Sequence, residues 1–295
     1  MEIIPLGPGF AAELRGVTLA GVAADDDVYR SVRAAFEEHS VIVLRDQDVT
    51  DEAQIAFSRR FGPLEVTPAS TPGAGTHLVI LTTIGKDGKV VAADDRLALR
   101  NKANQLWHAD STFKSTPALA SVLSGRVMPA HGGETEYVST RLAWDRLDPA
   151  TQRRLETMFA WHDYSHSRGK IAANIVSDAE RASLPPQCWR MVWKNPANGR
   201  NALYVASHAY AIEGMEQSAA QQFLAELIEA ATAPGLSYEH SWRQGDVVMW
   251  DNRATLHRGR PWPADEARLM VRTTISATDA DGLRSVRPPS RQAAE

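Results

Sequence analysis

Residues 267–275 of this 295-residue chain read Ala-Arg-Leu-Met-Val-Arg-Thr-Thr-Ile, an alternating pattern typical of a β-strand. Side chains alternate along a strand, so one face presents Arg268, Met270, Arg272 and Thr274. The opposite face presents Leu269, Val271, Thr273 and Ile275. This apolar face must be buried. The two arginines therefore lie either on a solvated surface or inside a cavity.

A cavity is the natural place for Arg268 and Arg272 if the strand belongs to a jelly roll whose outer face is covered by helices. An unpaired buried charge is costly, so each guanidinium would then need an anionic partner. Guanidinium groups match carboxylates in a bidentate manner, which predicts one or two carboxylate-bearing ligands. A half-exposed strand with two ordinary surface arginines stays open as the alternative.

Further short strands and several helices surround this segment. Apolar or β-branched runs predict strands at residues 40–45, 78–82, 118–123, 135–138, 202–205 and 247–250. Helical periodicity and capping residues predict helices at 25–39, 51–61, near 140–159 and at 218–231. We expect an α+β fold, mainly β, in which a double-stranded β-helix (jelly roll) core is flanked by helices.

Composition limits the classes of protein that this chain can belong to. With 43% hydrophobic and 23% charged residues it is globular, and we expect a single catalytic domain over residues 1–295. The net charge of −4 offers no basic face for nucleic acid, and no apolar run is long enough to span a membrane. The single cysteine, Cys188, excludes an internal disulfide framework. We expect a cytoplasmic homo-oligomer that acts on a small molecule.

Two segments are expected to lie outside the packed core. Residues from about 66 to 104 are rich in Thr, Pro, Gly and Asp and lead directly into the motif described next, so we interpret them as a lid over an active site. Residues from about 280 to 295 are rich in Arg, Pro, Ser and Ala and are expected to form a flexible tail.

His108 and Asp110, in the run Gln-Leu-Trp-His-Ala-Asp at residues 105–110, indicate a metal site. On an extended segment the two side chains point to one face, and His257 far downstream can complete a triangle. Two histidines and one carboxylate leave the opposite coordination positions open, as in non-haem Fe(II) oxygenases. By itself, a His and an Asp two residues apart more often form a surface turn or a hydrogen-bonded pair.

With further motifs at residues 44–47 (Leu-Arg-Asp-Gln), 57–62 (Phe-Ser-Arg-Arg-Phe-Gly), 132–135 (Gly-Gly-Glu-Thr) and 250–253 (Trp-Asp-Asn-Arg), the chain resembles the taurine dioxygenase family of Fe(II)- and 2-oxoglutarate-dependent oxygenases. Residues 103–108 and 257–260 are especially similar to the branch that cleaves phenoxyalkanoate herbicides, the 2,4-dichlorophenoxyacetate dioxygenases. The resemblance runs over nearly the whole chain.

This resemblance implies a role for each matching residue. His108, Asp110 and His257 would bind Fe(II), and Thr135 and Arg268 would hold the distal carboxylate of 2-oxoglutarate. Arg272 occupies the position that meets the anionic end of the main substrate. Asn104 and His208 fall near the substrate pocket, although a turn residue and an ordinary core or surface histidine remain their alternative roles.

The implied reaction uses O2 to hydroxylate a small anionic substrate and releases succinate and CO2. For an aryloxyalkanoate, hydroxylation beside the ether oxygen gives a hemiacetal that collapses to a phenol and a 2-oxo acid. Thr67 and Ser70 stand where taurine-cleaving members carry a histidine and a tyrosine, which does not favour taurine itself. An alkyl sulfonate or sulfate ester substrate, a zinc-dependent hydrolase with the same ligands and a non-catalytic binding jelly roll are the alternatives.

Overall fold

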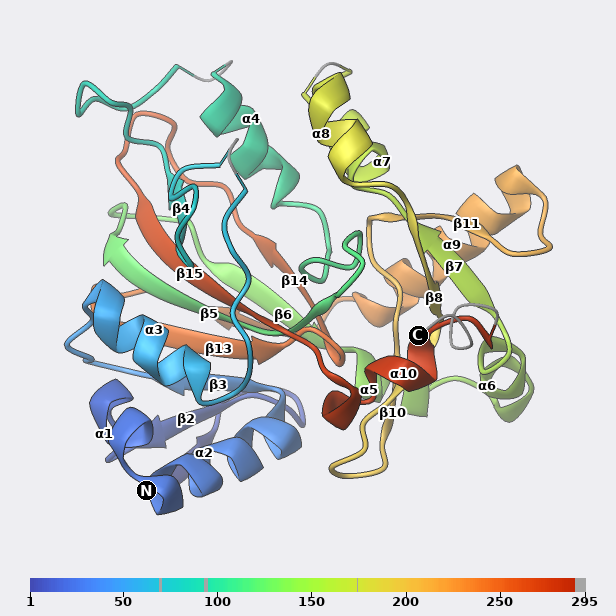
Figure 1. The fold of residues 1–295 in the computed structure, drawn as a ribbon, viewed down its shortest axis with the longest axis horizontal. Coiled ribbons are helices and arrows are strands. Elements are labelled where there is room, and N and C mark those ends of the chain that lie inside the picture. Colours follow the sequence, from blue (N-terminus) through green and yellow to red (C-terminus); the bar gives the residue numbers. More distant parts are fainter. Residues whose placement is uncertain (69–70, 93–94, 174, 290–295) are drawn as a thin grey trace.

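The computed structural model describes residues 1–68, 71–92, 95–173 and 175–289, and the fold is α+β (Figure 1). Its larger sheet contains seven strands, which are antiparallel to their neighbours except for the parallel second and third. In spatial order the strands are β1 (Glu2–Pro5), β2 (Ala12–Arg15), β3 (Val41–Leu44), β13 (Val247–Asp251), β5 (Ala118–Val127), β15 (Leu269–Ser276) and β4 (Val79–Thr82).

A second, three-stranded sheet packs against one face of the larger sheet. It is formed by β12 (Ser237–His240), β6 (Thr135–Ser139) and β14 (Thr255–Gly259). Tyr137 of β6 and Tyr238 of β12 share an apolar layer with Leu123, Trp250 and Met270 of the larger sheet. This shared layer is the inner core of the protein, and the functional side chains described below lie beside it.

Helices cover the outer face of the larger sheet. These are α1 (Leu19–Ala24), α2 (Asp26–His39) and α3 (Asp51–Arg59), which lie below and in front of the sheet in Figure 1. Phe36 of α2 and Phe57 of α3 pack with Met249 and Ile275 in a second apolar layer. Asp25 and Thr50 cap α2 and α3, since their side chains accept hydrogen bonds from the first turns.

The predicted two-faced strand at 268–275 is confirmed as β15. Ile275 joins the layer beneath the helices, whereas Met270 lies in the inner layer between the sheets. Because Arg268 and Arg272 alternate in step with Met270, they also face the interior of the sandwich. The apolar face of this strand packs under the helices, so both arginines point to the inside. This is the arrangement that the sequence pattern predicts for a sheet covered by helices.

The remaining elements form a smaller layer at the right of Figure 1, with its own apolar cluster. The strands are β7 (Phe159–His162), β8 (Gln187–Arg190) and β11 (Ala209–Ile212) in one sheet and the hairpin β9 (Val192–Lys194) and β10 (Asn201–Leu203). The helices are α5 (Thr140–Asp145), α6 (Pro149–Leu155), α7 (Tyr164–Gly169), α8 (Asp178–Ser183) and α9 (Gln217–Ala231).

The prediction of a helix near residues 140–159 is wrong in the length of that helix. The chain forms two helices, because Asp148 caps a new helix that has Pro149 in its first turn. Phe159 then opens β7, which pairs with β8 and β11. The other predicted helices, at 25–39, 51–61 and 218–231, are confirmed as α2, α3 and α9.

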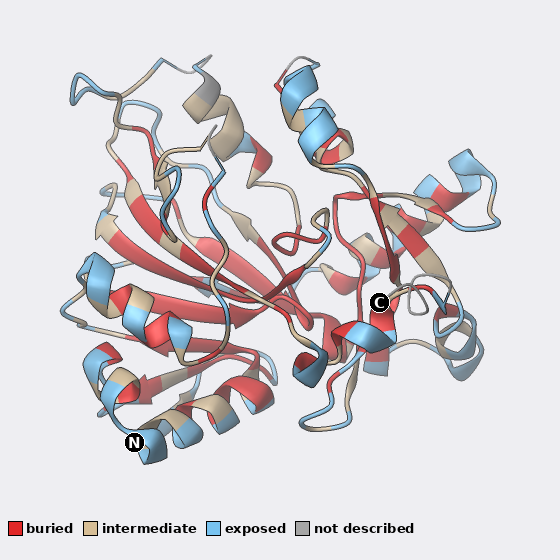
Figure 2. Ribbon diagram, in the orientation of Figure 1, coloured by how far each residue is buried: buried red, intermediate tan, exposed pale blue. Residues whose placement is uncertain are grey.

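The segment at residues 66–104 contains β4 at the edge of the larger sheet and α4 (Arg96–Ala103), which lies at the top of Figure 1. The flexible tail expected from about residue 280 is wrong for its first part. A 3-10 turn at Asp279–Asp281 and α10 (Leu283–Val286) pack there, and Leu283 and Val286 are buried (Figure 2). Residues 290–295 lie outside the described part of the chain.

Within the same described ranges, no helix is both long and apolar enough to cross a membrane.

Candidate metal centre and adjoining cavity

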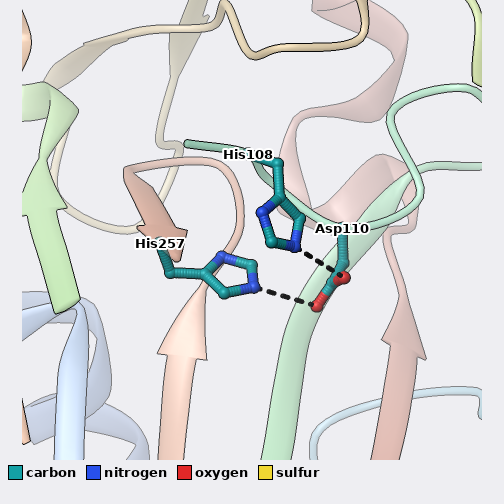
Figure 3. Close-up of side chains that lie close together, drawn as sticks. All are labelled: His108, Asp110 and His257. Atoms are coloured by element: carbon teal, nitrogen blue, oxygen red, sulfur yellow. Dashed lines mark ion pairs between the residues drawn. The ribbon is translucent and has the colours of Figure 1, made fainter. Parts of the chain in front are cut away.

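His108, Asp110 and His257 converge between the two sheets, and all three are buried (Figure 3). One ligand atom from each residue can be chosen so that all three lie within 4.8 Å of one another. The Nε2 atoms of His108 and His257 lie 4.0 Å and 3.7 Å from the two carboxylate oxygens of Asp110. Two imidazoles and one carboxylate at this spacing can bind one divalent metal ion.

An isolated antiparallel bridge brings the two histidines together. His108 and His257 each donate a backbone N–H to the other's carbonyl, at 3.0 Å and 2.8 Å, and their rings lie 4.1 Å apart. Asp110 lies in a turn beyond this bridge, next to Ser111 in the left-handed backbone region (φ 57°). The extended segment expected for the His-x-Asp pair is therefore limited to His108, and the turn directs Asp110 towards the histidines.

Asp110 is held by three neighbours, of which only Arg272 was predicted as a site residue. The Ser121 hydroxyl donates to Oδ2 at 2.6 Å, and the Asn252 amide oxygen accepts the backbone N–H of Asp110 at 2.9 Å. Arg272 donates to Oδ1 at 2.5 Å. Burial alone would raise the pKa of Asp110, but the Arg272 charge, with those histidines, holds it below its usual value. The carboxylate is therefore ionised, as metal binding requires.

The histidines are in the form that binds metal. The Nδ1 atom of His108 lies 2.6 Å from the Leu106 carbonyl oxygen, which fixes a proton on Nδ1 and leaves the Nε2 lone pair free. Burial lowers the pKa of His108 to about 4 and that of His257 well below its usual value. Both rings are neutral near pH 7, so this donor set fits a divalent ion.

Arg268 is a buried cation in the space between the sheets. Its Nη2 donates to the Gly133 carbonyl at 3.0 Å, and its guanidinium lies 4.7 Å from the Trp262 ring centre. Among the described residues it has no ion pair, and its Nε has no hydrogen-bond partner. Burial lowers the pKa of Arg268 to about 10, so the side chain stays charged near neutral pH. This arrangement fits an anion that would complete the pairing.

Thr135 begins β6 in this same inter-sheet region. Its hydroxyl oxygen accepts a hydrogen bond from the Trp242 indole N–H at 2.9 Å, and the hydroxyl proton remains available for donation. Tyr137, two residues later on the same strand face, stacks on the His257 ring at 6.1 Å. Burial raises the pKa of Tyr137 well above its usual value, so its phenol stays protonated.

A cavity of about 190 Å³ opens next to the triad. Among the predicted site residues it is lined by Asn104, His108, Asp110, His208 and Arg272, together with side chains from the segment 66–104. Thr135 and Arg268 are not among the described residues that line it. The buried cation Arg268 is therefore separate from the cavity that Arg272 lines.

Asn104 and His208 each combine a structural contact with a place in the cavity wall. Asn104 ends α4, and its carbonyl accepts the backbone N–H of Gly259 at 2.9 Å. His208 is buried, and its Nδ1 lies 3.4 Å from the Thr112 hydroxyl. Its Nε2 has no partner among the described residues, and burial lowers its pKa well below the usual value. A neutral His208 can donate one hydrogen bond from Nε2 when Nδ1 accepts from Thr112.

Sequence reasoning missed Ser121, Asn252, Phe113 and Arg168. Ser121 lies on the inner face of a strand that was predicted, so alternation along residues 118–123 could have placed it beside the site. Asn252 belongs to the quoted Trp-Asp-Asn-Arg motif. Phe113, in the turn region after Asp110, and Arg168, on α7, line the cavity, and only the packing of these two segments against each other reveals this.

Comparison with known proteins agrees with this geometry. Residues 2–274 match the family model described as "Taurine catabolism dioxygenase TauD, TfdA family". The chain is 38% identical over 275 residues, 92% of this chain and 96% of the relative, to an alpha-ketoglutarate-dependent 2,4-dichlorophenoxyacetate dioxygenase from Cupriavidus pinatubonensis. It is 35% identical over 287 residues, 95% of this chain and 96% of the relative, to a (S)-phenoxypropionate/alpha-ketoglutarate-dioxygenase from Sphingobium herbicidovorans.

Among solved structures, the crystal structure of AAD-2 in complex with Mn(II) and N-oxalylglycine superposes with a TM-score of 0.87 at 36% identity. The match covers 94% of this chain and 98% of that one. The family model and these relatives each extend over nearly the whole chain, and the residues that the family model matches include the triad, Arg268 and Arg272. The chain therefore belongs to the TauD/TfdA dioxygenase family.

Proposed function

We propose that this protein is an Fe(II)- and 2-oxoglutarate-dependent dioxygenase that hydroxylates an aryloxyalkanoate acid. The products are a phenol and a 2-oxo acid, with succinate and CO2 from the co-substrate. The names of the relatives support the reaction class and this substrate class. One observation on this chain carries the proposal: a triad suited to a metal lies beside a buried Arg268 that has no carboxylate partner in the described structure.

His108, Asp110 and His257 would hold Fe(II). The bound ion supplies O2 activation coupled to the oxidative decarboxylation of 2-oxoglutarate. Ser121 and Asn252 hold Asp110 from behind, while the Leu106 carbonyl fixes the tautomer of His108. These contacts keep the three ligand atoms in place before the metal binds.

Arg268 and Thr135 would bind the distal carboxylate of 2-oxoglutarate. A carboxylate at this position satisfies the Arg268 Nε, which is buried without a hydrogen-bond partner. It would also accept a hydrogen bond from the Thr135 hydroxyl, whose oxygen already accepts one from the Trp242 indole N–H. The low-polarity surroundings strengthen both contacts.

The main substrate would occupy the cavity beside the triad. Arg272 would meet its anionic end, with Asn104 and His208 in the same wall. Phe113 lies against His208, with ring centres 4.9 Å apart, and offers a surface for an aryl group. Holding the reacting carbon near the metal and excluding water are the tasks of these residues.

The segment 66–104 would act as the lid of this cavity, since Thr67, Pro72, Ile80 and Leu97 line it. We propose that the two facing sheets form the double-stranded β-helix (jelly roll) core of one catalytic domain. Ser70, one of the two residues that make taurine an unfavoured substrate, lies outside the described residues. The homo-oligomer and the cytoplasmic location stay predictions.

The rival functions explain less of the site. A zinc hydrolase could use the same three ligands, but it would leave Arg268 and Thr135 without a role. A non-catalytic binding jelly roll would not need a triad with open positions. The same oxygenase chemistry on an alkyl sulfonate or a sulfate ester remains the alternative choice of substrate, because Arg272 would also bind those anions.

Anaerobic addition of Fe(II) and then 2-oxoglutarate tests the reaction class, since chelation by the 2-oxo acid should produce a visible charge-transfer band. A protein that binds zinc tightly and shows no such band would refute the oxygenase. Succinate formation against a panel of aryloxyalkanoates, alkyl sulfonates and sulfate esters tests the substrate class. Faster turnover with the sulfur acids than with phenoxyacetate would overturn our choice.

A further inference from the structure

The described lining of the cavity has more cationic than anionic side chains. Within the described lining, the cations are Arg100, Lys114, Arg168 and Arg272, and the carboxylates are Glu65, Asp110 and Glu180. Each carboxylate pairs with one cation: Glu65 with Lys114 at 2.5 Å, Glu180 with Arg100 at 2.6 Å and Asp110 with Arg272 at 2.5 Å. Arg168 is left without a carboxylate in the described lining.

Arg168 is placed to face a ligand. It lies half-buried on α7 with its guanidinium 4.9 Å from the ring centre of Tyr164, one helical turn earlier. Its Nε is buried and has no hydrogen-bond partner among the described residues. Stacking on a ring orients the guanidinium and leaves its N–H groups free for a planar anion.

A row of rings connects Arg168 with the metal ligands. Tyr164 contacts Phe113, Phe113 contacts His208 and His208 contacts His108, with ring centres 4.8 Å, 4.9 Å and 6.2 Å apart. The Nε2 of His208 is a second buried polar atom without a partner in the described structure. Arg168 and His208 line the same cavity, with the contacting rings of Tyr164 and Phe113 between them, so an anion in this cavity can meet both groups.

We infer that Arg168, together with the unpartnered Nε2 of His208, forms the subsite that recognises the carboxylate of the aryloxyalkanoate substrate. This inference rests on the proposed function and adds a specificity residue to it. Because Asp110 already compensates the charge of Arg272, Arg168 supplies the positive charge of the described lining that an incoming anion neutralises. Arg272 contributes its remaining N–H groups but little net charge.

Titration calorimetry on the protein loaded with Mn(II) and N-oxalylglycine tests this inference, with phenoxyacetate and its uncharged counterpart 2-phenoxyethanol as probes. Arg168→Gln should weaken phenoxyacetate binding about tenfold or more, as expected for loss of a charge-assisted pair, and change 2-phenoxyethanol binding little. Arg168→Lys should restore part of the lost affinity because it keeps the charge. Arg181→Gln, at an exposed arginine of the neighbouring α8, serves as the control.

Equal weakening of both probes in Arg168→Gln would mean that Arg168 acts through shape and would overturn the inference. Unchanged phenoxyacetate affinity in that variant would do the same. Failure of the wild type to bind N-oxalylglycine with Mn(II) would instead refute the proposed function. In that case, titration of the metal-free wild type and Arg168→Gln with phenoxyacetate still decides whether Arg168 binds the anion.

Discussion

Replacing Arg268 by methionine tests whether this arginine binds the co-substrate or stabilises the fold. Burial lowers the pKa of Arg268 from its usual value to about 10, which corresponds to about 3 kcal/mol against the charged side chain at pH 7. Proton linkage determines how this free-energy cost depends on pH. The native state releases this proton more readily than the unfolded chain, so the cost applies fully below the native pKa and is relieved only as the pH rises through it.

Methionine removes this cost and also removes the hydrogen bond to the Gly133 carbonyl. A hydrogen bond from a charged group contributes about 1.5–3 kcal/mol, so the two effects nearly cancel. We expect the unfolding free energy of the metal-free variant to lie within about 2 kcal/mol of the wild type. Arg253→Met is the matched control, because Arg253 is buried with Asp251 and Glu37 at 2.9 Å and 2.8 Å. Breaking such pairs costs about 3–5 kcal/mol.

Urea denaturation with and without Mn(II) and N-oxalylglycine provides the measurement. At a ligand concentration of about 100 times Kd, the wild type should gain about 2.7 kcal/mol, and Arg268→Met should gain almost nothing. A ligand-dependent gain equal to that of the wild type would refute the assignment of Arg268 to the co-substrate. A loss as large as that of Arg253→Met in the absence of ligand would show that Arg268 stabilises the fold.

Ser121→Ala removes a 2.6 Å hydrogen bond to Asp110 and should weaken Mn(II) binding about tenfold by calorimetry; unchanged affinity would contradict its orienting role. Phe113→Ala should raise KM for phenoxyacetate several-fold in a succinate assay and leave KM for 2-oxoglutarate unchanged, since its ring lines the cavity and Arg268 does not. His162→Phe should reduce acid sensitivity. Burial lowers the pKa of His162 from 6.5 to about 3, so stability is lost as the pH falls below 6.5, by about 3 kcal/mol at pH 4.5. Denaturation at pH 7 and 4.5 should show a drop smaller by that amount in the variant, and an identical drop would exclude His162 as the cause.

The sequence predicted those strands and helices whose own pattern of apolar residues shows which face is buried. The alternation at residues 268–275 identified β15 and the direction of its arginines, because one face had to meet the helices. The strand β7 was missed, since it is stabilised by pairing with β8 and β11, about 30 and 50 residues further along the chain. Its short run carries no alternation that distinguishes it from a helix end.

In the candidate site, too, some residues could be predicted from the sequence and others could not. Residue types and spacing pointed to His108, Asp110 and His257 as candidate metal ligands, and the structure brings these three side chains together. Residue types and spacing did not suffice for the groups that hold these ligands: the amide of Asn252 donates to the Ser121 hydroxyl at 3.1 Å across 131 residues of chain. Such contacts depend on the packing of the two sheets, which no short motif encodes.

The register of β15 and of Arg268 just before it explains why Arg268 and Arg272 would act on different anions in the proposed reaction. Four residues separate them on one strand face, so their Cα atoms lie about 13 Å apart. Their guanidiniums are held by different partners, Arg268 by the Gly133 carbonyl and Trp262, and Arg272 by Asp110 beside the cavity. One carboxylate cannot satisfy both without breaking these contacts. An anion held at Arg268 would therefore leave Arg272 free for a second anion, which would enter through the cavity, where Arg168 is the cation that has no carboxylate partner in the described lining.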